Sequence, residues 1–140
     1  MVTLVHLLPA SCILLAAALV NGTLQGAPAA AVTTASGVYS VAQAKRGEQT
    51  YMNVCLACHP AGTYTTEAFR EKWNGAPLSD LFELVAATMP KHEPGSLATN
   101  DYVNVVAYLL KINGAPTGAR DLPADEQAMK KIRINMPRSK

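Results

Sequence analysis

The chain has 140 residues, of which 49% are hydrophobic and 16% are charged. This length allows one domain, and the composition is typical of a folded globular protein, which excludes extensive disorder. The formal charge of +2 is too small for the dense basic surface of a nucleic-acid-binding protein. Three cysteines are too few for a small fold that disulfides hold together.

The first 44 residues contain no Asp, Glu, Lys or Arg, so this part of the chain differs from the rest. An apolar run at residues 13–20 is followed by small residues at positions 27–31. The run is too short to span a bilayer, which takes about 20 residues, and this order is typical of a secretory signal peptide. We expect a signal peptide over residues 1–31, removal of Cys12 with it, and export to the periplasm. An uncleaved membrane anchor is the alternative.

A helical pattern over residues 40–52 leads into the sequence Cys55-Leu56-Ala57-Cys58-His59. This is the C-x-x-C-H signature of covalent haem attachment. On a helical turn, the spacing puts both thiols on one side, where they add to the two vinyl groups of one haem. His59 then lies beneath the iron and can ligate it. We therefore expect one covalent haem c.

Two other chemistries use a C-x-x-C pair. A thioredoxin-like redox pair follows a strand within a βαβ pattern, whereas a helical pattern precedes Cys55 here. A zinc site needs a second Cys or His pair, which the chain after residue 31 lacks. A thiol–disulfide oxidoreductase remains a distant alternative.

Beyond the motif, the sequence predicts helices and no convincing alternating strands. Thr66 is a suitable N-cap for a helix that reaches Trp73, and Ser79 is the expected cap of the next helix. The last core helix begins at Thr99 or Asn100 and ends at Asn113-Gly114. Its predicted inward stripe consists of Val103, Val106, Ala107 and Leu110.

A short helix over residues 125–132 is predicted next, because its acidic residues come first and its basic residues last. Met129, which lies on this helix, is expected to be a packing residue. The basic tail from Lys130 to Lys140 is expected to be solvated, or else to dock an acidic partner or anionic lipid head groups. Association with a membrane therefore stays open.

The second axial ligand of the haem must come from elsewhere in the chain. The candidates are Met52, Met89, His92, Met129 and Met136. Pro90 follows Met89 and disfavours a helical backbone there, so Met89 is predicted in an extended loop that can lay its thioether over the haem. Met136 and His92 are the alternatives. If both axial positions are filled, the iron can only change charge, which favours an electron carrier over an enzyme or a gas sensor.

These residues together resemble a class I c-type cytochrome. The matching segments are Gly47, Tyr51, the C-x-x-C-H motif, and residues 88–90, 94–97 and 102–110. The resemblance implies an all-α protein with a small class I cytochrome c fold wrapped around one covalently bound haem. The haem domain would span residues 40–114, between a linker at 32–39 and a C-terminal extension at 115–140. It also implies that the first and last helices cross where Gly47 and Tyr51 meet Tyr108.

Five segments are also similar to monohaem cytochromes that serve periplasmic quinoprotein alcohol or sugar dehydrogenases: residues 69–73, 78–82, 88–90, 94–97 and 107–110. This implies single-electron transfer from a dehydrogenase to the respiratory chain and a terminal oxidase. The alternatives are a general respiratory shuttle and an oxidase-associated subunit. In similar cytochromes a tryptophan contacts a haem propionate, so Trp73 is a candidate for that contact as well as for core packing.

In such cytochromes a proline carbonyl often accepts the ring N–H of the haem histidine. Here Pro60 follows His59 directly, and the next proline is Pro77, so the sequence does not identify the acceptor. Tyr64 and Lys72 are expected at the surface, and His92 is expected to be a solvated loop residue.

Overall fold

The computed structural model describes residues 31–138. The predicted signal peptide, apart from residue 31, lies outside the described residues, as do Cys12 and Lys140. None of the helices within the described range combines the length and apolar character needed to cross a bilayer.

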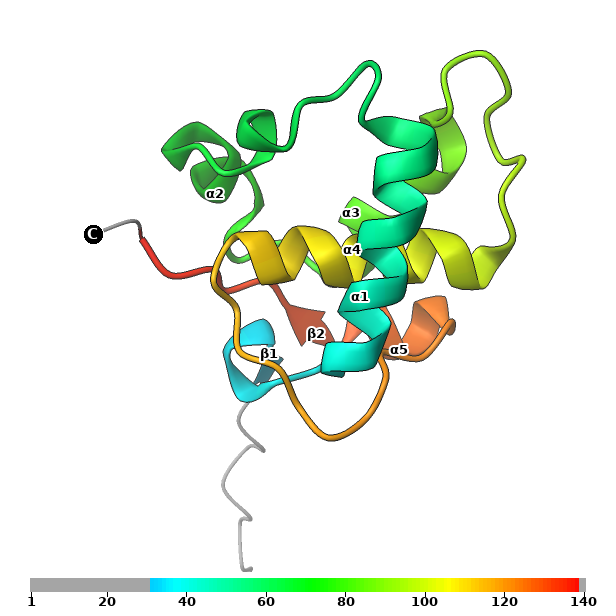
Figure 1. Ribbon diagram of the computed structural model, residues 1–140. Helices are drawn as coiled ribbons and strands as arrows, with labels where there is room; N and C mark the ends of the chain where they lie inside the picture. The colour runs from blue at the N-terminus through cyan, green and yellow to red at the C-terminus, as the bar shows by residue number, and fades with distance from the viewer. Residues whose placement is uncertain (1–30, 139–140) are drawn as a thin grey trace, which may run out of the picture.

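Helices make up most of the described chain, and their order follows the sequence prediction (Figure 1). The elements are β1 (Val32–Thr33), η1 (Thr34–Ser36), α1 (Val41–Thr50), η2 (Tyr51–Cys55), η3 (Ala61–Tyr64), α2 (Glu67–Trp73), α3 (Leu78–Thr88), α4 (Thr99–Ile112), α5 (Glu126–Lys130) and β2 (Ile132–Arg133). The expected all-α architecture is confirmed, with one minimal pair of strands added.

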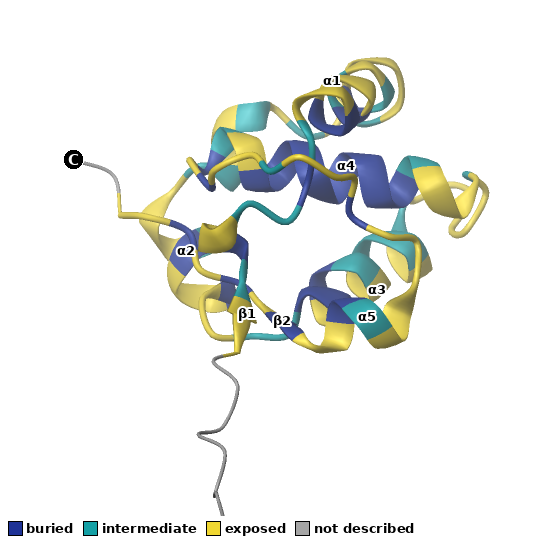
Figure 2. Ribbon diagram, turned by 90° about the horizontal axis from the view of Figure 1, so that it is seen from below, coloured by how far each residue is buried: buried dark blue, intermediate teal, exposed yellow. Residues whose placement is uncertain are grey.

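Helix α4 forms the centre of the core, as its dark blue ribbon in Figure 2 shows. The four residues of the predicted stripe are buried, and so are all the remaining residues from Tyr102 to Leu110. A single stripe underestimates this burial because α1 and α3 both pack on α4. The helix ends at Ile112 with Asn113 as its C-cap, and Gly114 follows in the left-handed conformation, in agreement with the predicted Asn113-Gly114 stop.

Helices α1 and α4 cross in direct contact, and Gly47 is the point of closest approach (Figure 1). A Cβ atom at Gly47 would lie 1.8 Å from the carbonyl oxygen of Asn104 and 3.0 Å from Cβ of Tyr108. One turn further along, the Tyr51 and Tyr108 rings pack with their centroids 5.1 Å apart. The crossing implied by the cytochrome resemblance is therefore present.

The starts of α2 and α3 differ in how they are capped. Thr66 caps α2 as predicted, because its Oγ1 accepts a hydrogen bond from the Phe69 backbone N–H at 3.2 Å. The prediction for α3 was wrong: Pro77 is the N-cap residue, and Ser79 lies buried in the first turn. Proline fixes φ near the helical value and lacks an N–H, so it can begin a helix without a capping side chain.

The C-terminal extension packs back on the domain. Its alternating residues Ile132, Ile134 and Met136 are buried, and Met129 is fully buried, as predicted for a packing residue. Strand β2 pairs in parallel with β1, a pairing that the sequence pattern did not indicate. Asn74 fixes Met136 through its side chain, which accepts from the Met136 N–H at 2.7 Å and donates to the Met136 carbonyl at 3.1 Å.

We predict that Gly47→Ala lowers the free energy of unfolding of the holoprotein by about 1–2 kcal/mol. Alanine is the better helix former by about 1 kcal/mol, but the new methyl group would overlap the Asn104 carbonyl, and overpacking of a core costs about 1–3 kcal/mol or more. Denaturant unfolding followed by circular dichroism measures the change.

Gly62→Ala is the matched control, because a Cβ at Gly62 meets no described atom within 4 Å. This variant is expected to stay within about 0.5 kcal/mol of the parent protein. Equal stability of the Gly47→Ala variant and the parent would contradict the close crossing.

Candidate functional site

The predicted site residues surround one cavity of about 370 Å³. Cys55, Cys58, His59, Trp73 and Met89 all line it, although they come from η2, α2 and the loops that follow η2 and α3. The rest of the lining is largely apolar and includes side chains of Tyr51, Val54, Phe69, Leu81, Leu84, Val85, Val105 and Leu109. A cavity of this size lies within the roughly 300–1,000 Å³ typical of cofactor sites.

The cysteine motif begins at the last residue of η2, the wider helical turn that continues α1. The backbone N–H groups of Cys58 and His59 both donate to the carbonyl of Cys55, at 3.2 and 2.9 Å. Both cysteines of the described chain are free thiols; Cys55 is half-buried and Cys58 is exposed. Burial raises the pKa of the Cys55 thiol, which keeps it protonated at neutral pH.

His59 is held from two sides by tyrosines. The hydroxyl of Tyr64 lies 2.8 Å from Nδ1 of the His59 ring, and the hydroxyl of Tyr51 donates to the His59 backbone carbonyl. The expected surface position of Tyr64 was therefore wrong, because the residue is half-buried against His59. With Nδ1 engaged in this way, Nε2 is the ring nitrogen available to a ligand in the cavity.

Burial keeps the two tyrosines beside His59 in their neutral form. The pKa of Tyr51 is raised to about 12, mainly by burial and in smaller part by the nearby Tyr64, Cys55 and Tyr108, which would repel a phenolate. The pKa of Tyr64 is also raised, first by burial and then by Cys55. Both groups are therefore uncharged hydroxyls at physiological pH.

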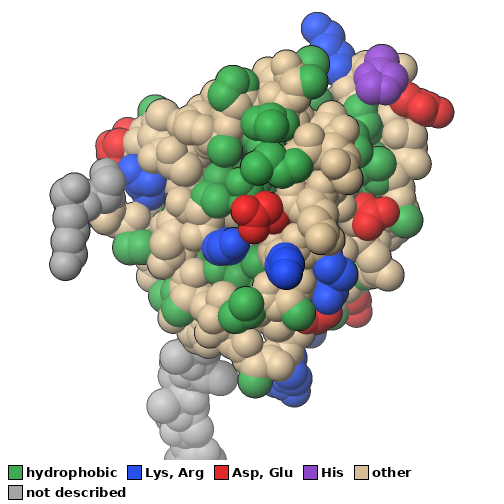
Figure 3. All heavy atoms as spheres, in the orientation of Figure 1, with side chains coloured by type: hydrophobic (Ala, Val, Ile, Leu, Met, Phe, Trp, Pro, Cys, Tyr) green, Lys and Arg blue, Asp and Glu red, His purple; other side chains and the backbone are tan. Residues whose placement is uncertain are grey.

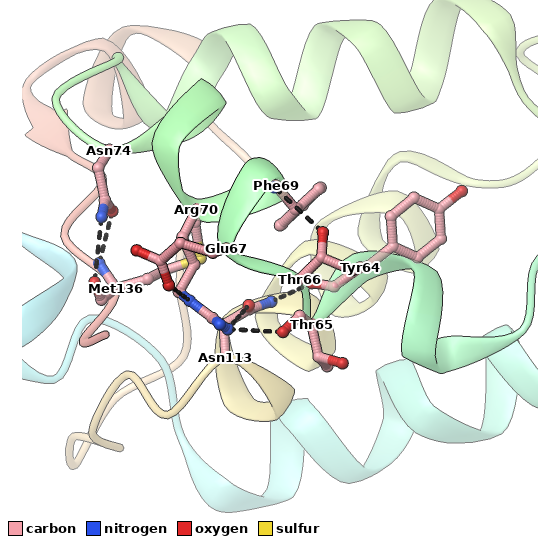
Figure 4. A network of polar contacts seen from close by, with 9 residues as sticks. All are labelled: Tyr64, Thr65, Thr66, Glu67, Phe69, Arg70, Asn74, Asn113 and Met136. Atoms are coloured by element: carbon pink, nitrogen blue, oxygen red, sulfur yellow. Dashed lines mark hydrogen bonds and ion pairs between the residues drawn. The ribbon is translucent and has the colours of Figure 1, made fainter. Parts of the chain in front are cut away.

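A polar network anchors the backbone of Tyr64, and Figure 4 shows its members. Asn113, at the end of α4, donates through Nδ2 to the Tyr64 carbonyl at 2.8 Å. Arg70, which is 5% exposed, donates through Nη1 to the Thr65 carbonyl at 2.8 Å and to Asn113 Oδ1 at 3.2 Å. Its Nε pairs with the Glu67 carboxylate at 3.1 Å. The end of η3 is thus tied to α2 and α4.

Met89 has the extended backbone that the sequence predicted, with φ −125° and ψ 150°. Its carbonyl accepts a hydrogen bond from the buried Tyr102 hydroxyl on α4 at 2.7 Å. The Tyr102 oxygen also accepts from the Leu97 N–H at 3.3 Å, so one tyrosine anchors both ends of the loop after α3. This anchoring keeps Met89 at the cavity.

The other candidates for the second axial position are placed differently. Met129 and Met136 are buried in the core of the described chain, outside the cavity lining, and Met52 is 51% exposed. His92 is exposed, as expected, and lines the cavity. Of the sequence candidates, the structure therefore brings Met89 and His92 to the cavity.

Trp73 lines the cavity and also belongs to the hydrophobic core, with an exposed fraction of 8%. The Lys72 Nζ lies 5.1 Å from the centroid of the Trp73 ring, and Lys91 is a second lysine in the lining. No acidic side chain is among the described residues that line the cavity. Its charged lining therefore favours an anionic group such as a carboxylate.

These side chains fit a haem c. The lining offers two thiols for covalent attachment, an imidazole and a thioether for the iron, lysines near which carboxylates can lie, and an apolar interior for the macrocycle. The described His, Cys, Asp and Glu residues form no group of three that could hold a bare metal ion. The lining therefore suits a haem, which brings its own iron, better than a metal ion alone.

Comparison with known proteins agrees with this fit. Residues 42–109 match a family model described as cytochrome C oxidase, cbb3-type, subunit III. The match includes all of α1 except Val41, the cysteine motif, Met89 and most of α4. No curated protein and no solved structure matches the chain.

Proposed function

We propose that this chain carries electrons from a periplasmic dehydrogenase to the respiratory chain, through a class I c-type cytochrome domain that binds haem c covalently. The cytochrome domain itself makes this a monohaem electron-transfer protein. The dehydrogenase partner, the periplasmic location after removal of residues 1–31, and the link to a terminal oxidase belong to the proposal.

The observation that carries the proposal is the convergence of Cys55, Cys58, His59 and Met89 on one apolar cavity. When bound, the haem supplies a centre that gains and loses one electron. In our assignment, Cys55 and Cys58 would tether it, and His59 and Met89 would both ligate its iron. No position then remains for a substrate, which favours electron transfer over catalysis.

The other lining residues exclude water and meet the charges of the cofactor. Apolar side chains from η2, α3 and α4 line the interior of the cavity. We assign the Trp73 indole N–H to a haem propionate, and Lys72 supplies positive charge beside that ring. The two propionates cancel the formal charge of +2 on the polypeptide, so the holoprotein is close to neutral.

Docking in this proposal uses a small apolar patch at the cavity, formed by Val54 and Leu84, which are 37% and 43% exposed. Positive and negative side chains are interspersed on the face shown in Figure 3, so a large field of one sign is lacking there. Small, brief encounters are typical of redox partners and need little buried area. The proposed docking partner is a quinoprotein alcohol or sugar dehydrogenase, as the family resemblance implies.

A second candidate comes from the description of the matching family, which names a subunit of a cbb3-type oxidase. In that case the chain would deliver electrons within an oxidase complex instead of collecting them from a soluble dehydrogenase. The same haem site serves both roles, so the partner decides between them.

We predict that Met89→Ala lowers the reduction potential and abolishes the weak sulfur-to-iron charge-transfer band of the oxidised holoprotein. The reason is that methionine–histidine ligation raises the potential of a haem. Redox titration and absorption spectroscopy measure the two effects.

Met136→Ala is the matched control, since Met136 is 2% exposed and packs in the core. It should reduce stability by about 2–5 kcal/mol and leave the band in place. Loss of the band in the Met136 variant, with the band intact in the Met89 variant, would reverse the assignment.

We predict that a quinoprotein dehydrogenase reduces the oxidised holoprotein at a rate that depends only weakly on ionic strength. A nearly neutral protein gains little from long-range electrostatic steering. Stopped-flow mixing with candidate alcohol and sugar dehydrogenases across a salt series gives the rates.

Failure of every dehydrogenase, combined with rapid exchange with an oxidase complex, would favour the oxidase-associated role. A rate that falls steeply with salt would contradict apolar docking and would implicate the basic residues from Lys130 onward.

A further inference from the structure

We propose that Tyr64 is a positioning residue for the haem: its hydroxyl oxygen accepts the Nδ1–H of His59, fixes the ring with Nε2 toward the cavity, and lowers the reduction potential. This inference rests on the proposed ligation by His59. The sequence did not identify the acceptor of the His59 ring N–H, and this inference assigns that role to the Tyr64 side chain.

The direction of the hydrogen bond follows from the chemistry of a ligated imidazole. A neutral imidazole that binds iron through Nε2 carries its proton on Nδ1. At 2.8 Å from Nδ1, the Tyr64 oxygen is then the acceptor of that proton. Such a contact fixes both the tautomer and the rotation of a ligating histidine.

The position of Tyr64 is determined at its backbone and at its ring. The backbone carbonyl accepts from Asn113, and the next residue, Thr65, is bound by the buried guanidinium of Arg70 (Figure 4). The ring packs edge-on against Phe69 at 5.4 Å and against Tyr51 at 6.5 Å between centroids. A hydroxyl held in this way can orient the His59 ring, which lies 5.7 Å from the Tyr64 ring.

The effect on the potential has a definite sign. An acceptor at Nδ1 draws the proton away from the ring and makes the imidazole a stronger donor to iron. A stronger donor stabilises the oxidised, more positive iron more than the reduced iron. Removal of the acceptor should therefore raise the potential.

The test is Tyr64→Phe in the purified holoprotein, which removes the hydroxyl and keeps the ring. We expect the ratio of reduced to oxidised protein at a fixed applied potential to rise at least threefold. For one electron this is about 30 mV, at about 59 mV per tenfold change.

Tyr39→Phe is the matched control, because the buried Tyr39 hydroxyl donates to the Ala115 carbonyl at 2.6 Å and Tyr39 is not among the described residues that line the cavity. This variant should lose stability without a change in potential. Equal shifts in the two variants would show a general effect of destabilisation and would overturn the proposal. An unchanged potential in Tyr64→Phe would also overturn it.

A second measurement needs no variant. In the reduced holoprotein labelled with ¹⁵N-histidine, proton NMR should show a nuclear Overhauser contact between the His59 Nδ1–H and the ring protons of Tyr64. If His59 resonances carry the large ring-current shift of a haem ligand but lack this contact, the inference fails and His59 ligation stands. If the ring-current shift itself is absent, the proposed ligation by His59 fails.

Discussion

The contact between α1 and α4 at Gly47 determines where the cofactor site can lie. Since no Cβ separates the two backbones, α1 approaches the carbonyl of Asn104 directly. The same helix continues through Tyr51 into η2, so its position on α4 also sets the position of Cys55 and of the turn that follows. A wider crossing would move the motif away from the cavity. The need for this close approach explains why a glycine occupies position 47, although glycine lowers the stability of a helix.

Helix α4 anchors the site a second time through its polar side chains. Tyr102, in its first turns, holds the carbonyl of Met89, while Asn113, at its other end, holds the carbonyl of Tyr64. The loop that carries the proposed methionine ligand and the segment that orients the proposed histidine ligand are therefore fixed by the same buried element. Both contacts are made to the backbone, so they position a loop without specifying its exposed side chains. This explains how a small domain keeps side chains from distant segments around one cavity.

Much of this arrangement could be predicted from local sequence, and the parts that could not depend on distant contacts. The Thr66 cap, the Asn113-Gly114 stop and the extended Met89 follow from a few neighbouring residues, and the structure confirms them. The contact of Tyr64 with His59 was missed because the Tyr64 backbone is fixed by Asn113, 49 positions along the chain. Strand pairing of β1 with β2 was missed because each strand has only two residues, too few to show alternation. Ser79 was a plausible cap, but Pro77 began the helix earlier.

We propose that this chain binds its haem covalently and supplies both ligands of the iron. The most direct measurement is the absorption spectrum of the purified, reduced protein before and after addition of carbon monoxide. We expect the spectrum of a low-spin haem c that carbon monoxide leaves unchanged, because His59 and Met89 would leave no ligand position of the iron open. Rapid formation of a carbon monoxide adduct would show an open position and disprove this ligation, and a protein without haem absorbance would disprove haem binding.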